Sequence, residues 1–335
     1  MRARLDQLRW SSAQAGVSLS LASSAWLLSG LTPSPLLNSL LPAMTTLPAL
    51  LPIRRRAGGF LLVVLSAAAL LLICSPLAKQ LPTSLAVAAV LLAGLTIALG
   101  QDISQLPLQR ELLRLPRLNF QQLRRGSELG ALAGFSLTGL IRPGVHQFMP
   151  AALLLLPLLP TAFQSEDQAN GAISLPAFHL KAALQGWIFG GFFGLLPLWV
   201  RSIADGNCFN FGVVLAAYGI GRSLSSKPPM RSGWAFYGSI AALLLAGQFL
   251  PGWLTTVLFI PMGFLAATTD RRMVQQLSPD DPAQGWQILQ RSGAIGGLIG
   301  VLAMGAIAQS IGLPHALLVQ LALFLTAPFL LRHAQ

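Results

Sequence analysis

Residues 121–139 read QQLRRGSELGALAGFSLTG, and residues 287–305 read QILQRSGAIGGLIGVLAMG. The two stretches lie 166 residues apart in a chain of 335, and seven of their 19 aligned positions are identical. An apolar, glycine-marked helix that recurs at half the chain length is typical of membrane transporters with two similar halves. We expect close helix packing at the repeated glycines, which are Gly130, Gly134, Gly139, Gly296, Gly300 and Gly305.

The composition indicates a polytopic membrane protein. Hydrophobic residues make up 54% of the chain and charged residues 10%, whereas soluble domains carry about 25% charged residues. A span needs about 20 mostly apolar residues. The sequence predicts an all-α protein with twelve spans, at residues 11–31, 35–53, 58–77, 82–101, 123–142, 145–163, 180–200, 207–225, 232–250, 252–269, 287–311 and 313–331.

These spans form two predicted six-helix halves, residues 1–163 and 180–335, joined by a polar cytoplasmic linker at residues 164–179. Two further polar segments, 102–122 and 270–286, occupy equivalent places in the halves. Both mix charged residues with leucine, methionine or tryptophan. We expect each to form a short interfacial helix leading into the next span.

The basic residues predict the orientation. With the N-terminus inside, 19 of the 22 lysines and arginines fall in inner segments, and only Lys79, Arg142 and Arg201 fall in outer ones. This asymmetry obeys the positive-inside rule and places both termini in the cytoplasm of an inner-membrane, multi-pass protein. The net charge of +12 is therefore explained by topology, without nucleic-acid binding. We see no pattern of a cleaved signal peptide.

Two longer stretches carry a family resemblance. Residues 23–52 read SSAWLLSGLTPSPLLNSLLPAMTTLPALLP, and residues 194–225 read GLLPLWVRSIADGNCFNFGVVLAAYGIGRSLS. Together with the duplicated segment, they make the chain resemble the major facilitator superfamily. The resemblance is to its bacterial exporter branch, which includes siderophore and macrolide exporters. It implies twelve helices in two pseudo-symmetric halves that transport by alternating access.

The chain departs from the family at two charged motifs. The family loop between spans 2 and 3 usually holds an acidic residue before its arginines. Here Arg54 and Arg55 stand in an arginine run without that acid, and residues 81–100 hold no arginine. The resemblance implies a gate of charge contacts on the inner side. We expect Asp102 or Glu128 to supply the missing negative charge.

Three further charged groups have open interpretations. Glu128 follows Arg124 and Arg125, so it is either a proton-carrying or gating acid or an interfacial carboxylate paired with one of these arginines. Arg201 and Asp205 close the outer end of the seventh span. They form either an outer gate pair or an ordinary loop salt bridge.

Polar and aromatic residues within the spans are candidates for a central cavity. Amide side chains need hydrogen-bond partners in hydrocarbon and should face the bundle interior. The candidates are Gln14, Ser18, Trp26, Asn38, Thr45, Gln185 and Tyr218. Such a lining is mostly apolar and suits a hydrophobic or amphipathic solute. Trp187 and Trp199 are interpreted as interface anchors at the two ends of the seventh span.

Signals of catalysis are weak. The four histidines lack metal-ligand spacing, and the sequence holds neither a phosphate-binding loop nor a nucleophile elbow. We expect no enzymatic activity, metal or cofactor. The predicted function is export of a small molecule by a monomer in the lipid bilayer, driven by protons or another ion. The alternative is a non-transporting member that binds a lipid or pigment or helps to assemble a membrane complex. A more polar cavity would favour an importer.

Overall fold

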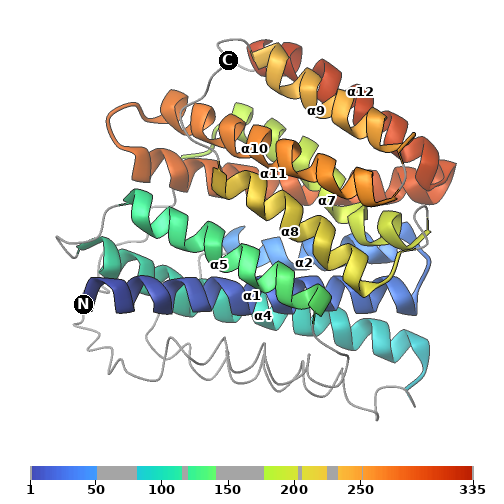
Figure 1. Cartoon of the computed structure of the whole chain (residues 1–335), viewed down its shortest axis with the longest axis horizontal. Helices are drawn as coiled ribbons and strands as arrows, with labels where there is room; N and C mark the ends of the chain where they lie inside the picture. The colour runs from blue at the N-terminus through green and yellow to red at the C-terminus, as the bar shows by residue number, and fades with distance from the viewer. Residues whose placement is uncertain are drawn as a thin grey trace. The chain divides into compact units, whose positions relative to one another are not determined.

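The computed structural model describes residues 2–50, 81–114, 120–140, 177–202, 206–224, 233–250 and 252–333. Every regular element in these ranges is an α-helix (Figure 1). Ten predicted spans correspond to helices, and the predicted spans 58–77 and 145–163 lie outside the described residues. The helices are α1 (Arg2–Leu31), α2 (Pro35–Leu50), α4 (Thr83–Arg114), α5 (Phe120–Leu140), α7 (Leu180–Ser202), α8 (Cys208–Leu224), α9 (Gly233–Gly247), α10 (Gly252–Leu277), α11 (Pro282–Ile311) and α12 (Leu313–His333).

Contacts divide the chain into two compact units. The first comprises residues 1–32 and 51–175, and the second comprises residues 33–50 and 176–335. Helix α2 therefore belongs with the C-terminal helices, where Gly305 of α11 faces Ser39. The Ser34 hydroxyl also donates to Gln309 Oε1 at 2.8 Å. The predicted halves follow chain order instead, and their boundaries stay a prediction.

In the first unit, α5 packs along α1 through its glycines (Figure 1). A Cβ atom at Gly130 would meet the Ser11 carbonyl oxygen, and one at Gly134 would meet that of Ala15. The missing side chains therefore allow two helix backbones to touch. We call such a glycine-lined contact between two helices a seam. Trp10 of α1 adds a hydrogen bond to this seam, because its indole N–H donates to Ser127 Oγ at 2.7 Å.

In the second unit, α11 packs along α7 in the same manner. A Cβ atom at Gly296 would meet the Ala183 carbonyl oxygen, and one at Gly300 would meet that of Trp187. In each pair of helices, two glycines four residues apart face two carbonyls four residues apart. The duplicated sequence thus makes a duplicated backbone contact.

The prediction of separate interfacial helices at residues 102–122 and 270–286 is wrong. Helix α4 continues from its apolar part to Arg114, and α10 continues to Leu277. After residue 269, the first proline or glycine is Pro279, which follows the end of α10 at Leu277. No helix-breaking residue therefore interrupts the polar end of α10. Helix α11 then starts at Pro282, where Asp281 caps it by accepting hydrogen bonds from the backbone N–H groups of Ala283 and Gln284.

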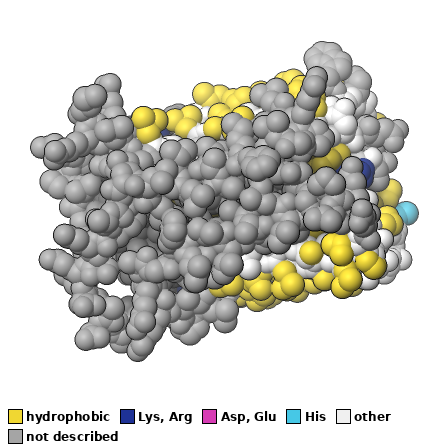
Figure 2. Space-filling view, turned by 90° about the horizontal axis from the view of Figure 1, so that it is seen from below, with side chains coloured by type: hydrophobic (Ala, Val, Ile, Leu, Met, Phe, Trp, Pro, Cys, Tyr) yellow, Lys and Arg dark blue, Asp and Glu magenta, His cyan; other side chains and the backbone are white. Residues whose placement is uncertain are grey.

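The exposed surface is apolar where helices face outward. Phe249 is 81% exposed, and Leu318, Leu325 and Phe329 form an exposed stripe along α12. Figure 2, which views the molecule from below, shows mostly hydrophobic side chains among the described residues visible there. Four described segments are long and apolar enough to cross a bilayer, namely Thr83–Gln101, Leu180–Arg201, Pro282–Ile311 and Leu313–Arg332. The chain is a multi-pass membrane protein whose exposed apolar side chains suit lipid.

Candidate functional site

The candidate site lies in the second unit and begins with the contact between α8 and α10. A Cβ atom at Gly221 would meet the Ile260 carbonyl oxygen, and one at Gly263 would meet that of Tyr218. The two backbones therefore touch at this crossing. This close approach brings the end of α8 within reach of a carboxylate further along α10.

Asp270 of α10 is the centre of the site. Its Oδ2 accepts a charge-assisted hydrogen bond from Arg222 Nη2 of α8 at 3.0 Å. Its Oδ1 accepts a second hydrogen bond from Gln185 Nε2 of α7 at 2.8 Å. The two side chains of the ion pair are 25% and 19% exposed, so water reaches the pair only partly. The carboxylate is thereby held between a guanidinium and a neutral amide.

Gln185 and Tyr218 extend this network. Gln185 is 2% exposed, and its Oε1 lies 3.5 Å from the hydroxyl of Tyr237, which donates to it from α9. The guanidinium carbon of Arg222 lies 5.8 Å from the centroid of the Tyr218 ring. This geometry permits a cation–π attraction. Four helices, α7 to α10, thus contribute side chains to one polar cluster, which we call the Asp270 network.

The Asp270 network can act as an electrostatic latch. The carboxylate ties α10 to α8 through Arg222 and to α7 through Gln185. Protonating Asp270 would weaken the charge-assisted contact and leave Arg222 with a smaller electrostatic attraction. Such a change would weaken the contacts that Asp270 makes with α7 and α8.

A second ion pair lies on α5. Arg124 Nε contacts Glu128 Oε1 at 3.2 Å, and the two side chains are 12% and 10% exposed. Glu128 is therefore paired with an arginine, as in the interpretation of an interfacial carboxylate. It is nevertheless less solvated than an ordinary interfacial carboxylate. Arg125 points to the exposed side of the same helix.

The remaining predicted site residues are dispersed. Gln14 and Ser18 lie in the seam of α1 against the glycines of α5. The Asn38 amide donates to the Ser34 carbonyl at 3.0 Å, and the Thr45 hydroxyl donates to that of Pro42 at 2.9 Å. Trp26 and Arg201 are half-buried. Arg54, Arg55, Asp205 and the side chain of Asp102 lie outside the described residues.

Sequence reasoning missed Arg222, Tyr237 and Asp270 as site residues. It placed Arg222 and Asp270 at inner span ends, where charged residues normally serve topology. One available signal was their spacing of 48 residues, which equals that from Arg54 to Asp102. Tyr237 gave no such signal, because a lone tyrosine in an apolar span has no visible partner.

Comparisons with known proteins show which solved structures share this fold. No protein-family model matches the chain, and no curated protein sequence matches it. Among solved structures, a mutant of the nucleoside transporter NupG matches with a TM-score of 0.64 and 14% identity, over 98% of this chain and 99% of that one. NupG itself matches with a TM-score of 0.59 and 14% identity, over 99% and 98%.

This likeness shows the fold of the chain. It is an all-α, polytopic fold like that of NupG, in agreement with the predicted fold class, and the likeness covers nearly the whole of both chains. Both neighbours are described as nucleoside transporters. A fold is shared by many activities, so substrate and direction of transport have to be argued from this chain itself.

Proposed function

We propose that the chain is a secondary transporter of the major facilitator superfamily that moves a small solute by alternating access. The observation that carries this proposal is the full-length likeness to NupG at a TM-score of 0.64. The duplicated glycine contacts of α1 with α5 and of α7 with α11 support it, because two similar halves are the basis of alternating access. Nothing in the comparisons favours the alternative of a non-transporting member that binds a lipid or pigment or helps to assemble a membrane complex.

The Asp270 network is the proposed gate or coupling element of the second unit. Partly buried carboxylates in membrane helices are costly and are commonly functional. Asp270 pairs with Arg222 across two helices, whereas Glu128 pairs within one helix. Breaking the Asp270 pair would therefore remove a contact between two helices, and breaking the Glu128 pair would remove one within α5. Glu128 stays a second candidate for the coupling acid.

In the first unit, Arg54 and Asp102 are candidates for an equivalent ion pair. The 48-residue spacing of Arg222 and Asp270 is repeated by Arg54 and Asp102. We propose that Asp102 supplies the negative charge for Arg54 or Arg55 that the family motif lacks here. The central cavity proposed from Gln14, Ser18, Trp26, Asn38 and Thr45 remains a hypothesis of the same kind.

The direction and substrate are proposed from two different sources. The mostly apolar spans suggest export of a hydrophobic or amphipathic solute. The fold neighbour is a nucleoside transporter by name, so nucleosides are the second class of candidate. Protons are the proposed coupling ion, because protonation of Asp270 provides a physical route to opening the latch.

The test is transport by the purified chain in proteoliposomes under an imposed pH gradient. Efflux-type dyes and labelled nucleosides are offered on either side of the membrane, for the wild type and for Asp270→Asn. We expect gradient-driven movement of one class by the wild type, and a loss of gradient dependence in the variant.

The matched control is Asp280→Asn, since Asp280 is exposed and outside the network. It should transport like the wild type. If no probe moved, the result would contradict transport and would favour a binding or assembly role. Equal transport by the wild type and Asp270→Asn would remove Asp270 from the coupling step.

A further inference from the structure

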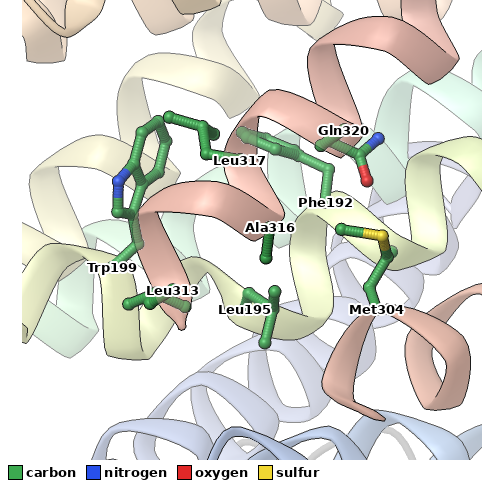
Figure 3. A pocket seen from close by; sticks show the side chains of 9 residues that line it. Phe192, Leu195, Trp199, Met304, Leu313, Ala316, Leu317 and Gln320 are labelled. Atoms are coloured by element: carbon green, nitrogen blue, oxygen red, sulfur yellow. The ribbon is translucent and has the colours of Figure 1, made fainter. Parts of the chain in front are cut away.

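A small pocket lies between α7, α11 and α12 of the second unit, away from the Asp270 network (Figure 3). Its volume is about 20 Å³. A space of about 10–15 Å³ on this measure holds one water molecule. The lining is apolar apart from the amide of Gln320, because the indole nitrogen of Trp199 points away from the other labelled side chains in Figure 3. The pocket can therefore admit the end of a slim molecule.

Gln320 presents a hydrogen-bond acceptor to this pocket. The residue is 2% exposed, and its Nε2 donates to the Ile188 carbonyl oxygen at 2.7 Å. The amide cannot be turned over, because Oε1 would then face another acceptor. Oε1 therefore points toward the pocket, as Figure 3 shows, and it has no hydrogen-bond partner among the described residues.

The pocket walls fix the position of this acceptor. Gly191 lies next to it, and a Cβ atom there would come within 3.0 Å of Gln320 Oε1 and 2.5 Å of Met304 Cγ. Phe192 is fixed by edge-to-face contacts with Trp199 at 6.0 Å and Phe324 at 6.4 Å, and by stacking on Phe259 at 6.2 Å. The site is thus built before any ligand arrives, which lowers the cost of binding.

The chemistry of the lining selects the ligand. A lone carbonyl oxygen accepts a hydrogen bond, so a carboxylate or phosphate would meet an unfavourable acceptor. An ammonium ion would lose its hydration without a carboxylate among the lining residues. A sugar carries more hydroxyl groups than the lining can pair. What remains is a neutral, mostly apolar molecule with one donor.

We propose that this pocket binds the hydroxyl end of an apolar alcohol, with Gln320 Oε1 as the acceptor and Phe192 and Leu317 as apolar walls. The site is separate from the proposed gate and goes beyond the proposed transport function. Binding can therefore be measured without transport.

The experiment compares two isomeric probes, hexanol and methyl pentyl ether, on the full chain in lipid nanodiscs. Both have the same atoms, and only hexanol has a donor. Tryptophan emission is followed, with Trp199→Phe used to identify the contribution of Trp199. The wild type should give a saturable change and bind hexanol about tenfold more tightly than the ether, which corresponds to one ordinary hydrogen bond.

Gln320→Met keeps the length of the side chain and removes the acceptor. It should bind both probes equally. Gly191→Ala, which crowds Gln320 Oε1, should weaken hexanol binding roughly tenfold. Gly238→Ala is the matched control, because a Cβ atom there meets nothing within 4 Å, and it should bind like the wild type.

Two results would overturn the proposal. One is equal or non-saturable responses to hexanol and the ether in the wild type. The other is a preference for hexanol that survives in Gln320→Met. Adding dioleoylglycerol to the nanodisc distinguishes the natural source, because a membrane lipid with a free hydroxyl would displace hexanol and a soluble alcohol site would leave its affinity unchanged. Either source supports the site.

Discussion

At the scale of the residue, Asp270 joins three helices through one carboxylate. Asp270→Asn keeps the shape of the side chain but removes its charge, so the partly buried pair with Arg222, whose side chain is 25% exposed, loses its ionic attraction. We expect a loss of about 1.5–3 kcal/mol in the free energy of unfolding, typical of a hydrogen bond between charged groups. Urea or SDS titration of the purified protein measures this value. The exposed Asp280→Asn should change it little, and equal losses in both variants would contradict the assignment.

His179 gives a prediction about pH. It precedes α7, its backbone N–H donates to Ser292 Oγ at 3.0 Å, and its ring nitrogen Nδ1 is buried without a partner among the described residues. Burial, and secondarily the nearby charge of Lys181, lowers the pKa of His179 below its ordinary value of 6.5. The unfolded chain therefore binds a proton at this position more readily than the folded chain does.

This difference determines how the stability of the folded chain depends on pH. The contribution of neutral His179 to stability is fully present above pH 6.5 and is lost as the pH falls through the lowered pKa of the folded state. The melting temperature of the wild type should thus fall more between pH 7 and 5 than that of His179→Gln. Thermal unfolding in detergent at several pH values measures it. Parallel pH curves for the two proteins would exclude His179 as the cause.

At the scale of the element, the paired glycine seams predict equal sensitivity in the two units. Gly134→Ala would press a Cβ atom onto the Ala15 carbonyl, and Gly300→Ala would press one onto that of Trp187. Each should cost about 1–3 kcal/mol, as overpacking usually does. Gly238→Ala, in open space inside α9, should be neutral or slightly stabilising. Melting temperatures of the three variants test this, and tolerance of either seam variant would refute close packing there.

The sequence could predict helices better than it could predict their faces. The glycine repeat located α5 and α11 because a missing side chain leaves a visible pattern in the chain. Apolar spans show no polar face, so their rotation is not encoded in periodicity. Gln185 was therefore proposed as a cavity residue, while its partner Asp270, 85 residues away, went unrecognised. Gln320 was missed for the same reason, since a single amide in an apolar span does not reveal what it faces.

At the scale of the whole molecule, the grouping of α2 with the C-terminal helices shows what chain order hides. The duplication suggests two halves cut at the middle of the sequence, but contact between elements depends on side chains such as Ser39 against Gly305. A repeat in sequence predicts equivalent helices and equivalent seams. It does not predict which unit a single helix such as α2 joins.

The orientation in the membrane is also a property of the whole chain, and it rests on 19 inner against 3 outer basic residues. A green fluorescent protein fused after Gln335 should be fluorescent, because the positive-inside rule places this end in the cytoplasm. Alkaline phosphatase fused after Gly206, in the segment between α7 and α8, should be active, because that segment is predicted to face outward. Exchanging the two reporters supplies the control, since each should then be silent. The opposite pattern would reverse the topology, and it would also place the Asp270 network at the outer end of the transporter.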